Sequence, residues 1–252
     1  MRYFIRLAFD GRAYHGWQRQ LKQSSVQQAI EEVLQKYFKE EVRIHGCGRT
    51  DAGVHAEDYY AHWDTEAEVS AEDLCILNKA LPRDISFTSI FPVPHYMNAQ
   101  RHAKGRRYRF RVHCRKNGAL YRSSTLIEMP VELSGIQEAL PAIVGLHDFR
   151  AFCKTPERHN STVMDVYEAE CFETGPDQFE FQIYASHFLR GFMRVMIHNL
   201  CELGAGSLSL QAFKERIESG QPPQFLTQAA PQGLALSQID YDWEEFGLDP
   251  KS

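Results

Sequence analysis

Cysteine is scarce in this sequence and never closely paired. The six cysteines stand far apart, and no CxxC motif occurs among them. We therefore expect reduced thiols rather than a disulfide framework, a pattern typical of a cytoplasmic protein. The PCxxC and HExxH signatures of zinc enzymes are missing, and so are nucleotide- and flavin-binding motifs. The sequence thus predicts no cofactor and no metal.

Long apolar runs are also missing. No stretch approaches the length of a membrane span, so no membrane partner is expected. The opening residues, "MRYFIRLAFD", alternate charged and apolar side chains, which favours a strand of the mature fold over a signal peptide. Without a long linker or a low-complexity tract, the parts of the chain are expected to pack together.

Acidic residues are absent between Asp84 and Glu128, although the whole chain carries a net charge of −5. This stretch holds nine cations and is +9, which leaves −14 for the rest of the chain. A solvated strand face is the ordinary explanation of a short basic run. A stretch of this length favours a polyanion partner instead, because salt screens charges beyond about 8–10 Å and binding depends on local charge. The nine cations are Arg101, Lys104, Arg106, Arg107, Arg109, Arg111, Arg115, Lys116 and Arg122.

The first half of the sequence predicts six elements in a row. Val26, Ile30 and Leu34 repeat at the spacing of a helix with one buried face. Ser70 and Asp73 are spaced as a capping box at the start of a second helix. The predicted elements are a strand over 2–10, a helix over 24–38, strands over 41–48 and 58–64, a helix over 70–80 and a strand over 84–93.

The second half repeats this order. In "GRRYRFRVHC", Tyr108 and Phe110 alternate with arginines, which predicts a strand with one apolar face. The "TGPD" turn predicts a hairpin. The predicted elements are a strand over 105–114, a helix over 132–144, strands over 163–173 and 178–185, helices over 188–203 and 209–219, and a last strand over 234–242.

Two copies of one order predict an α/β (α+β) fold made of two ferredoxin-like split βαβ halves. Joining the two sheets edge to edge would hide their exposed edges. We therefore expect one continuous, mainly antiparallel sheet with helices on one side. The halves are expected to be 1–103 and 104–252.

The motif "GCGRTDAGVHA" has the most distinctive composition in the chain. Its glycines allow a tight turn or a close approach to a ligand. Asp51 in such a turn can be presented outward as a nucleophile or base. Arg49, two residues earlier, would point to the same side of an extended segment and keep the carboxylate ionised.

Three other interpretations of the motif compete. Asp51 can simply cap its own turn, which is the commonest role of such an aspartate. A metal site would use His45, Cys47 and His55, but their spacing matches no zinc signature. A pair of carboxylates for glycoside hydrolysis would need a nearby partner such as Glu57, which lies in a strand.

The motifs of the whole chain, taken in order, resemble the tRNA pseudouridine synthase A family. They are "FDGRAYHGWQRQ", "SVQQAIEEVL", "GCGRTDAGVHA", "NKALPRDI", "KGRRYRF", "HDFRAF", "ASHFLRGFMRVMIHNLCELGAG" and "AAPQGLALSQIDYD". They span nearly the whole chain, and "GRTDAGVHA" is highly specific to the family.

The resemblance implies an isomerase that converts uridine to pseudouridine in tRNA without cofactor or metal. The family's targets lie on the 3′ side of the anticodon stem-loop, and its members act as homodimers that bind tRNA in an active-site cleft. Asp51 matches the catalytic aspartate, which would attack either the base or the sugar C1′ of the target. The base must leave its stack to be reached.

The resemblance also assigns roles to matched residues. Tyr108 would stack on the target base, and Arg49 would fill the space that the base leaves. Arg194 would pair with the aspartate, and Leu234 would line the pocket floor. Further expected substrate or RNA contacts are His55, Gln18, Arg106, Tyr14, His15 and Trp17.

The sequence departs from the family pattern at Gln100 and Arg101, where the family commonly has arginine and phenylalanine, and again at Val163 and Met164. These changes bear on how RNA is gripped rather than on Asp51. A non-catalytic or retargeted RNA-binding relative is therefore one alternative. A metal-dependent nucleic-acid enzyme is the other.

Overall fold

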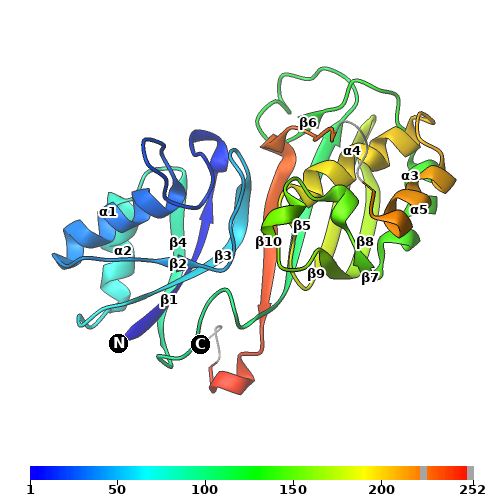
Figure 1. The fold of residues 1–252 in the computed structure, drawn as a ribbon. Coiled ribbons are helices and arrows are strands. Elements are labelled where there is room, and N and C mark those ends of the chain that lie inside the picture. Colours follow the sequence, from blue (N-terminus) through cyan, green and yellow to red (C-terminus); the bar gives the residue numbers. More distant parts are fainter. Residues whose placement is uncertain (222–225, 249–252) are drawn as a thin grey trace. The chain divides into compact units, whose positions relative to one another are not determined.

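The computed structural model describes residues 1–221 and 226–248 of the chain (Figure 1). The chain divides into two compact units, Met1–Lys104 with Leu236–Ser252, and Gly105–Ala235. The expected mixed α/β fold with a mainly antiparallel sheet is confirmed. Within the described ranges, no helix combines the length and the apolar character needed to cross a membrane.

The sheet of the first unit is built around β1 (Arg2–Phe9), as the sequence predicts. This strand pairs antiparallel with β3 (His55–Asp64) on one side and with β4 (Ile85–Val93) on the other. β10 (Leu234–Tyr241), whose residues from Leu236 on belong to this unit, follows β3 in the strand order. A strand from late in the sequence therefore lies in the same sheet as the strand near its start.

The strand predicted over 41–48 is much shorter than expected, because only His45–Gly46 form β2. Side chains of the neighbouring helix take up the backbone groups of the preceding residues. The amide of Ile44 donates to Glu31 Oε1 (3.2 Å), and its carbonyl accepts from Gln27 Nε2 (3.0 Å). These groups are satisfied without a partner strand.

The two helices of the first unit begin where their caps predict. α1 (Val26–Phe38) follows Ser25, whose side chain accepts a backbone hydrogen bond in the first turn. α2 (Ala71–Ala80) follows the capping box of Ser70 and Asp73, which the structure contains in full. Figure 1 shows both helices against the sheet of this unit.

The C-terminal segment packs into the core of the first unit. The Tyr241 hydroxyl donates to the Ala99 carbonyl (2.6 Å). The Trp243 ring lies 5.7 Å from the Phe91 ring and 5.6 Å from the Tyr60 ring, measured between centroids. These contacts give the end of the chain a structural role far from its sequence neighbours.

The sheet of the second unit has the order β5-β9-β8-β7, with all three neighbouring pairs antiparallel. The predicted hairpin is confirmed, and its strands are β8 and β9. Two short strands were not predicted: β6, which runs parallel to β5, and β7 at the end of the order. The strands are β5 (Ala103–His113), β6 (Thr125–Leu126), β7 (Gly145–Asp148), β8 (Val163–Gly175) and β9 (Gln178–Ala185).

The helices of the second unit are shorter than predicted. α3 (Leu133–Ala139) continues as a 3-10 turn over Leu140–Ile143, since Pro141 lacks the amide that would extend the α-helix. α4 (Phe192–Gly204) begins four residues later than expected, because Gly191 takes φ +75°. α5 (Leu210–Ser219) begins and ends close to its predicted limits. These helices pack against one another and against β7 and β8 (Figure 1).

Candidate active site

Asp51 begins a tight turn between β2 and β3. The Val54 amide donates to the Asp51 carbonyl (3.2 Å), which closes the turn. Gly53 takes φ +79°, a conformation that residues with a side chain adopt at a cost. The motif therefore forms the glycine-framed turn that the sequence predicts.

A second loop holds this turn by its backbone. The Trp17 amide donates to the Thr50 carbonyl (3.3 Å), and the Gly53 amide donates to the Tyr14 carbonyl (3.2 Å). Gly16 takes φ +91°, and a Cβ atom there would overlap the Thr50 carbonyl oxygen. Only glycine lets the two loops approach this closely.

Tyr14 anchors the second loop in turn. Its hydroxyl donates to Asp84 Oδ1 (2.8 Å), and burial together with Asp84 raises the pKa of Tyr14. The Asp84 carbonyl also accepts from the Asp10 amide (2.8 Å). Asp84, the residue that precedes β4, thus holds the loop at Asp10 and at Tyr14. This support was not predicted, since residues so far apart in the sequence give no local signal of their contact.

The side chains of Asp51 and Arg49 take no part in the contacts that support the turn. Asp51 is partly exposed and Arg49 is exposed. Within the part of the chain that the structure describes, neither side chain has a hydrogen-bond or ion-pair partner. The carboxylate does not cap its own turn, and Arg49 does not pair with it. Both groups are open to a ligand.

His55 and Gln18 have partners within the first unit. His55 Nδ1 lies 3.2 Å from Asp10 Oδ1, and a hydrogen bond from Arg12 lowers the pKa of Asp10. Gln18 Nε2 donates to Gln27 Oε1 (2.7 Å). These contacts give both residues a part in holding the loops around Asp51.

Trp17 does not match its expected RNA contact. It is 2% exposed, and its ring lies 4.2 Å from the Tyr59 ring. A Cβ atom on Gly46 would overlap the Tyr59 hydroxyl and the Trp17 ring. Trp17 is therefore a core residue, whereas His15 in the same loop is exposed.

The metal interpretation gains no support from the geometry. Across residues 1–221 and 226–248, no group of three or more histidine, cysteine or acidic side chains is arranged to hold a metal ion. Cys47 is buried, and the His45 ring stacks on the His62 ring at 5.2 Å.

In the second unit, Tyr108 and Arg106 meet the segment before α4. The Tyr108 ring makes an edge contact with the Phe188 ring, 4.8 Å between centroids. Arg106 donates to the Ser186 carbonyl (2.8 Å). Tyr108 is partly exposed whereas Phe110, two residues along β5, is buried, so Tyr108 is not an ordinary core tyrosine.

Arg194 lies in the first turn of α4. Its Nε donates to the Ala229 carbonyl (2.7 Å), and the Ala229 amide donates to its carbonyl (2.9 Å). Leu234 begins β10 and is 4% exposed. Both residues are thus firmly positioned. The predicted site residues are divided between the units: Asp51, Arg49, His55 and Gln18 belong to the first, and Tyr108, Arg106, Arg194 and Leu234 belong to the second.

The basic strand β5 is less positive in the structure than in the sequence. Arg107 pairs with Glu168 of β8 (2.6 Å), and Arg111 pairs with Glu180 of β9 (2.7 Å). Glu180 also lies 3.9 Å from Arg109. The acid-free stretch of sequence is therefore lined by acids from the neighbouring strands.

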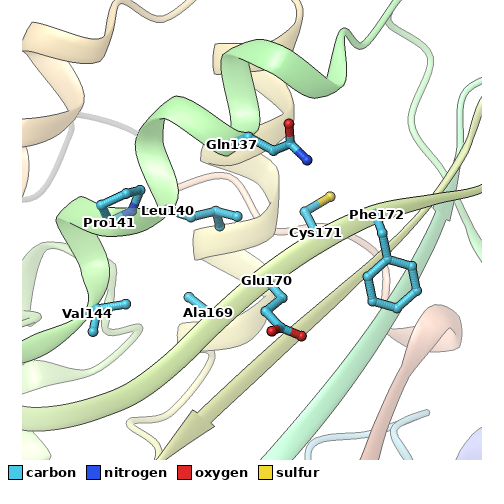
Figure 2. Close-up of a pocket in the computed structure, with 8 residues that line it drawn as sticks. All are labelled: Gln137, Leu140, Pro141, Val144, Ala169, Glu170, Cys171 and Phe172. Carbon is cyan, nitrogen blue, oxygen red and sulfur yellow. The ribbon is translucent and has the colours of Figure 1, made fainter.

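A pocket of about 780 Å³ lies elsewhere in the second unit. Figure 2 shows it between the end of α3 with its 3-10 turn and the β8 residues Ala169–Phe172. None of the predicted site residues lines it. It is not the predicted active site.

Proteins similar to this chain over nearly its full length share one name, "tRNA pseudouridine synthase A". The protein of that name from Gloeobacter violaceus is 33% identical over 96% of this chain and 81% of its own length. The one from Rippkaea orientalis is 34% identical over 97% and 84%. The one from Staphylococcus aureus is 31% identical over 100% and 97%.

The chain belongs to the tRNA pseudouridine synthase A family. A sequence model described as "tRNA pseudouridine synthase" matches residues 139–242, which include Arg194 and Leu234. Pseudouridine synthases are isomerases, so this member of the tRNA pseudouridine synthase A family is an enzyme of that class. The resemblance inferred from the motifs is confirmed.

Proposed function

We propose that the protein isomerises uridine to pseudouridine on the 3′ side of the anticodon stem-loop of tRNA, with Asp51 as the nucleophile. One observation carries the assignment to Asp51. Its carboxylate stands on a rigid turn of the family's most specific motif and has no protein partner among the described residues. A nucleophile needs this combination of fixed position and open approach.

The reaction conserves atoms and needs no oxidant. The bond between sugar C1′ and uracil N1 breaks, the uracil turns within the site, and a bond between C1′ and C5 forms. The proton lost from C5 is balanced by the proton gained at N1. The Asp51 carboxylate assists by attacking either the base or C1′, and both routes fit the partly exposed side chain.

Other residues would support this step. Tyr108 would stack on the target base, and the Phe188 edge contact keeps its ring in place for that role. Arg49, exposed and without a protein partner among the described residues, would fill the space that the base leaves. Arg194 would pair with the carboxylate of Asp51 in the substrate complex, and Leu234 would line the pocket.

The remaining predicted contacts would shape the RNA side of the site. His55 and Gln18 would do so through the loops that they hold, and Arg106 through the segment at Ser186. We further propose that the enzyme acts on tRNA in the cytoplasm as a homodimer. Light scattering of the purified protein tests the dimer directly.

The deciding experiment maps pseudouridine in an unmodified tRNA transcript after incubation with the protein. We expect product on the 3′ side of the anticodon arm, equally with and without EDTA. Asp51→Asn should lower the rate by at least about a thousandfold, as expected when a nucleophile is removed. Glu57→Gln, which neutralises an exposed carboxylate on β3, is the matched control and should keep near-normal activity.

Each alternative predicts a different outcome. Product that persists in Asp51→Asn would contradict the nucleophile. Binding of tRNA without product would identify a non-catalytic relative, and product only at other uridines would identify a retargeted one. Loss of activity in EDTA would identify a metal enzyme.

A further inference from the structure

The cations of the acid-free stretch fall into two groups in the structure. Arg107, Arg109 and Arg111 of β5 have carboxylate neighbours on β8 and β9. Arg115, just after β5, pairs with Asp177 (2.8 Å). Lys116 and Arg122 differ from them. Among the residues that the structure describes, their side chains have no hydrogen-bond or ion-pair partner. Among the described residues, cations without a side-chain partner therefore lie outside the strand: Lys116 and Arg122 follow it, and the exposed Arg101 precedes it.

Lys116 and Arg122 belong to the loop 115–123, which leaves β5 and leads to β6 (Figure 1). Between them stands Tyr121, which is 72% exposed. Apart from half-buried Leu120, every side chain of the loop is exposed. The loop thus presents one aromatic ring and two uncompensated cations to solvent.

The loop is ordered in spite of this exposure. The Leu120 amide donates to the Asn117 carbonyl (3.2 Å), and the Ser123 amide donates to the Leu120 carbonyl (3.0 Å). Just beyond it, Ser124 Oγ lies 2.9 Å from His113 Nδ1 on β5. Backbone turns and the Asn117 side chain, which accepts from the Ala119 amide (3.0 Å), fix the loop without using the side chains of Lys116, Tyr121 and Arg122.

An exposed ring between two cations matches the chemistry of RNA. Bases stack on aromatic rings whatever their sequence, and cations bind the phosphates beside them. A protein or lipid partner would favour a wider apolar surface, which the loop lacks. Within residues 1–221 and 226–248, the carboxylate that forms an ion pair with the loop is Asp177, and its partner is Arg115.

We propose that the loop 115–123 binds a part of the tRNA other than the reacting uridine. Tyr121 stacks on an unpaired base, while Lys116 and Arg122 contact the flanking phosphates. The proposal rests on the proposed function only in taking tRNA as the partner. The loop contributes to binding of the substrate and not to the chemical step.

The test compares Tyr121→Ala and the double variant Lys116→Gln/Arg122→Gln with the parent protein. For each we measure the Kd for tRNA against salt concentration, and KM and kcat. Tyr121→Ala should raise Kd and KM about tenfold with kcat unchanged, and Tyr121→Phe should restore both. The double variant should lower the slope of log K against log salt by about 2.

Matched control substitutions are available on elements outside the loop. Tyr167→Ala removes an exposed tyrosine that neighbours Glu168 on β8, and Lys79→Gln/Lys214→Gln removes two exposed cations from α2 and α5. Both should leave Kd and the salt slope unchanged. Since the loop side chains are exposed, unchanged thermal unfolding verifies that the loop variants fold.

An unchanged Kd in Tyr121→Ala together with an unchanged salt slope in the double variant would overturn the proposal. A fall in kcat with Kd unchanged would also overturn it. The Kd measurement needs no catalysis, so a parent protein that binds tRNA but forms no pseudouridine would contradict the proposed function and still test the loop.

Discussion

At the scale of single residues, glycines fix the setting of Asp51. Gly53 supplies the positive φ that closes the turn, and Gly16 lets the neighbouring loop reach the Thr50 carbonyl. The sequence predicted the turn because glycines frame the aspartate. It did not predict that position 16 must be glycine, because this requirement arises from contact with Thr50, more than thirty positions away.

His62 on β3 is a single residue with a predictable effect on stability. It is buried, and its Nδ1 accepts a hydrogen bond from the Ala99 amide (3.2 Å). Burial lowers the pKa of His62 to about 4, and Arg2 and His45 add to the effect. In the unfolded chain the pKa is about 6.5, so the unfolded state binds the proton first as pH falls.

We therefore expect the contribution of His62 to the free energy of unfolding to be independent of pH above about pH 7. Between about pH 6.5 and 4 the free energy of unfolding should fall by up to about 3 kcal/mol. Denaturant unfolding at several pH values measures this. His62→Asn keeps an acceptor near the position of Nδ1 and does not titrate, so it should flatten the slope. If the free energy of unfolding fell with pH as steeply in His62→Asn as in the parent protein, the effect would come from other groups.

At the scale of elements, the loop after β1 and the turn of Asp51 hold each other in place. The loop after β1 donates and accepts the backbone hydrogen bonds that hold residues 50–53. The sequence predicted the Asp51 turn from its glycines, but not that the loop after β1 contacts it. Likewise it predicted β5 from its alternation, whereas the pairing of its arginines with β8 and β9 became visible only in the sheet register.

Substituting Gly16 by alanine should lower both stability and kcat, whereas the same change at Gly48 should affect neither. Gly16→Ala places a Cβ against the Thr50 carbonyl at a positive φ, and should destabilise the protein by about 1–3 kcal/mol. It should also lower kcat by at least about tenfold, because the turn that carries Asp51 must shift. Gly48→Ala is the control, since a Cβ there meets nothing within 4 Å.

Activity on unmodified tRNA and denaturant unfolding of both variants test this pair. If Gly16→Ala lowered stability but left kcat unchanged, the loop would support the fold alone and not the position of Asp51.

At the scale of the whole molecule, the first compact unit combines the N-terminal part of the chain with a segment that begins at Leu236. Sequence order suggested two consecutive halves, but the structure places Leu236–Ser252 with the first unit. Tyr241 is 7% exposed there and hydrogen-bonds to Ala99. Tyr241, from the end of β10, therefore stabilises the unit that contains Asp51.

Variants of Tyr241 measure how much this segment contributes to the stability of the first unit. Tyr241→Ala should lower the free energy of unfolding by about 3 kcal/mol, from lost packing against Phe4 and Tyr60. Tyr241→Phe keeps the ring and should cost about 1 kcal/mol, the contribution of one hydrogen bond. Hydrogen exchange should show lower protection in β1 and β3. Loss of protection confined to the second unit would contradict the assignment.

The sequence by itself determined the elements that rest on local chemistry. Helix caps, strand alternation and glycine turns are written in neighbouring residues, so α1, α2, β1, the β8–β9 hairpin and the Asp51 turn were all predictable. The specific motifs likewise indicated the family and the candidate residues.

Only the tertiary structure decided what depends on distant neighbours. The carboxylates beside the arginines of β5, the burial of Trp17 and the bond between Tyr14 and Asp84 each join residues far apart in the chain. Charge, burial and close approach are properties of position in space. A linear pattern cannot specify them until the fold brings the partners together.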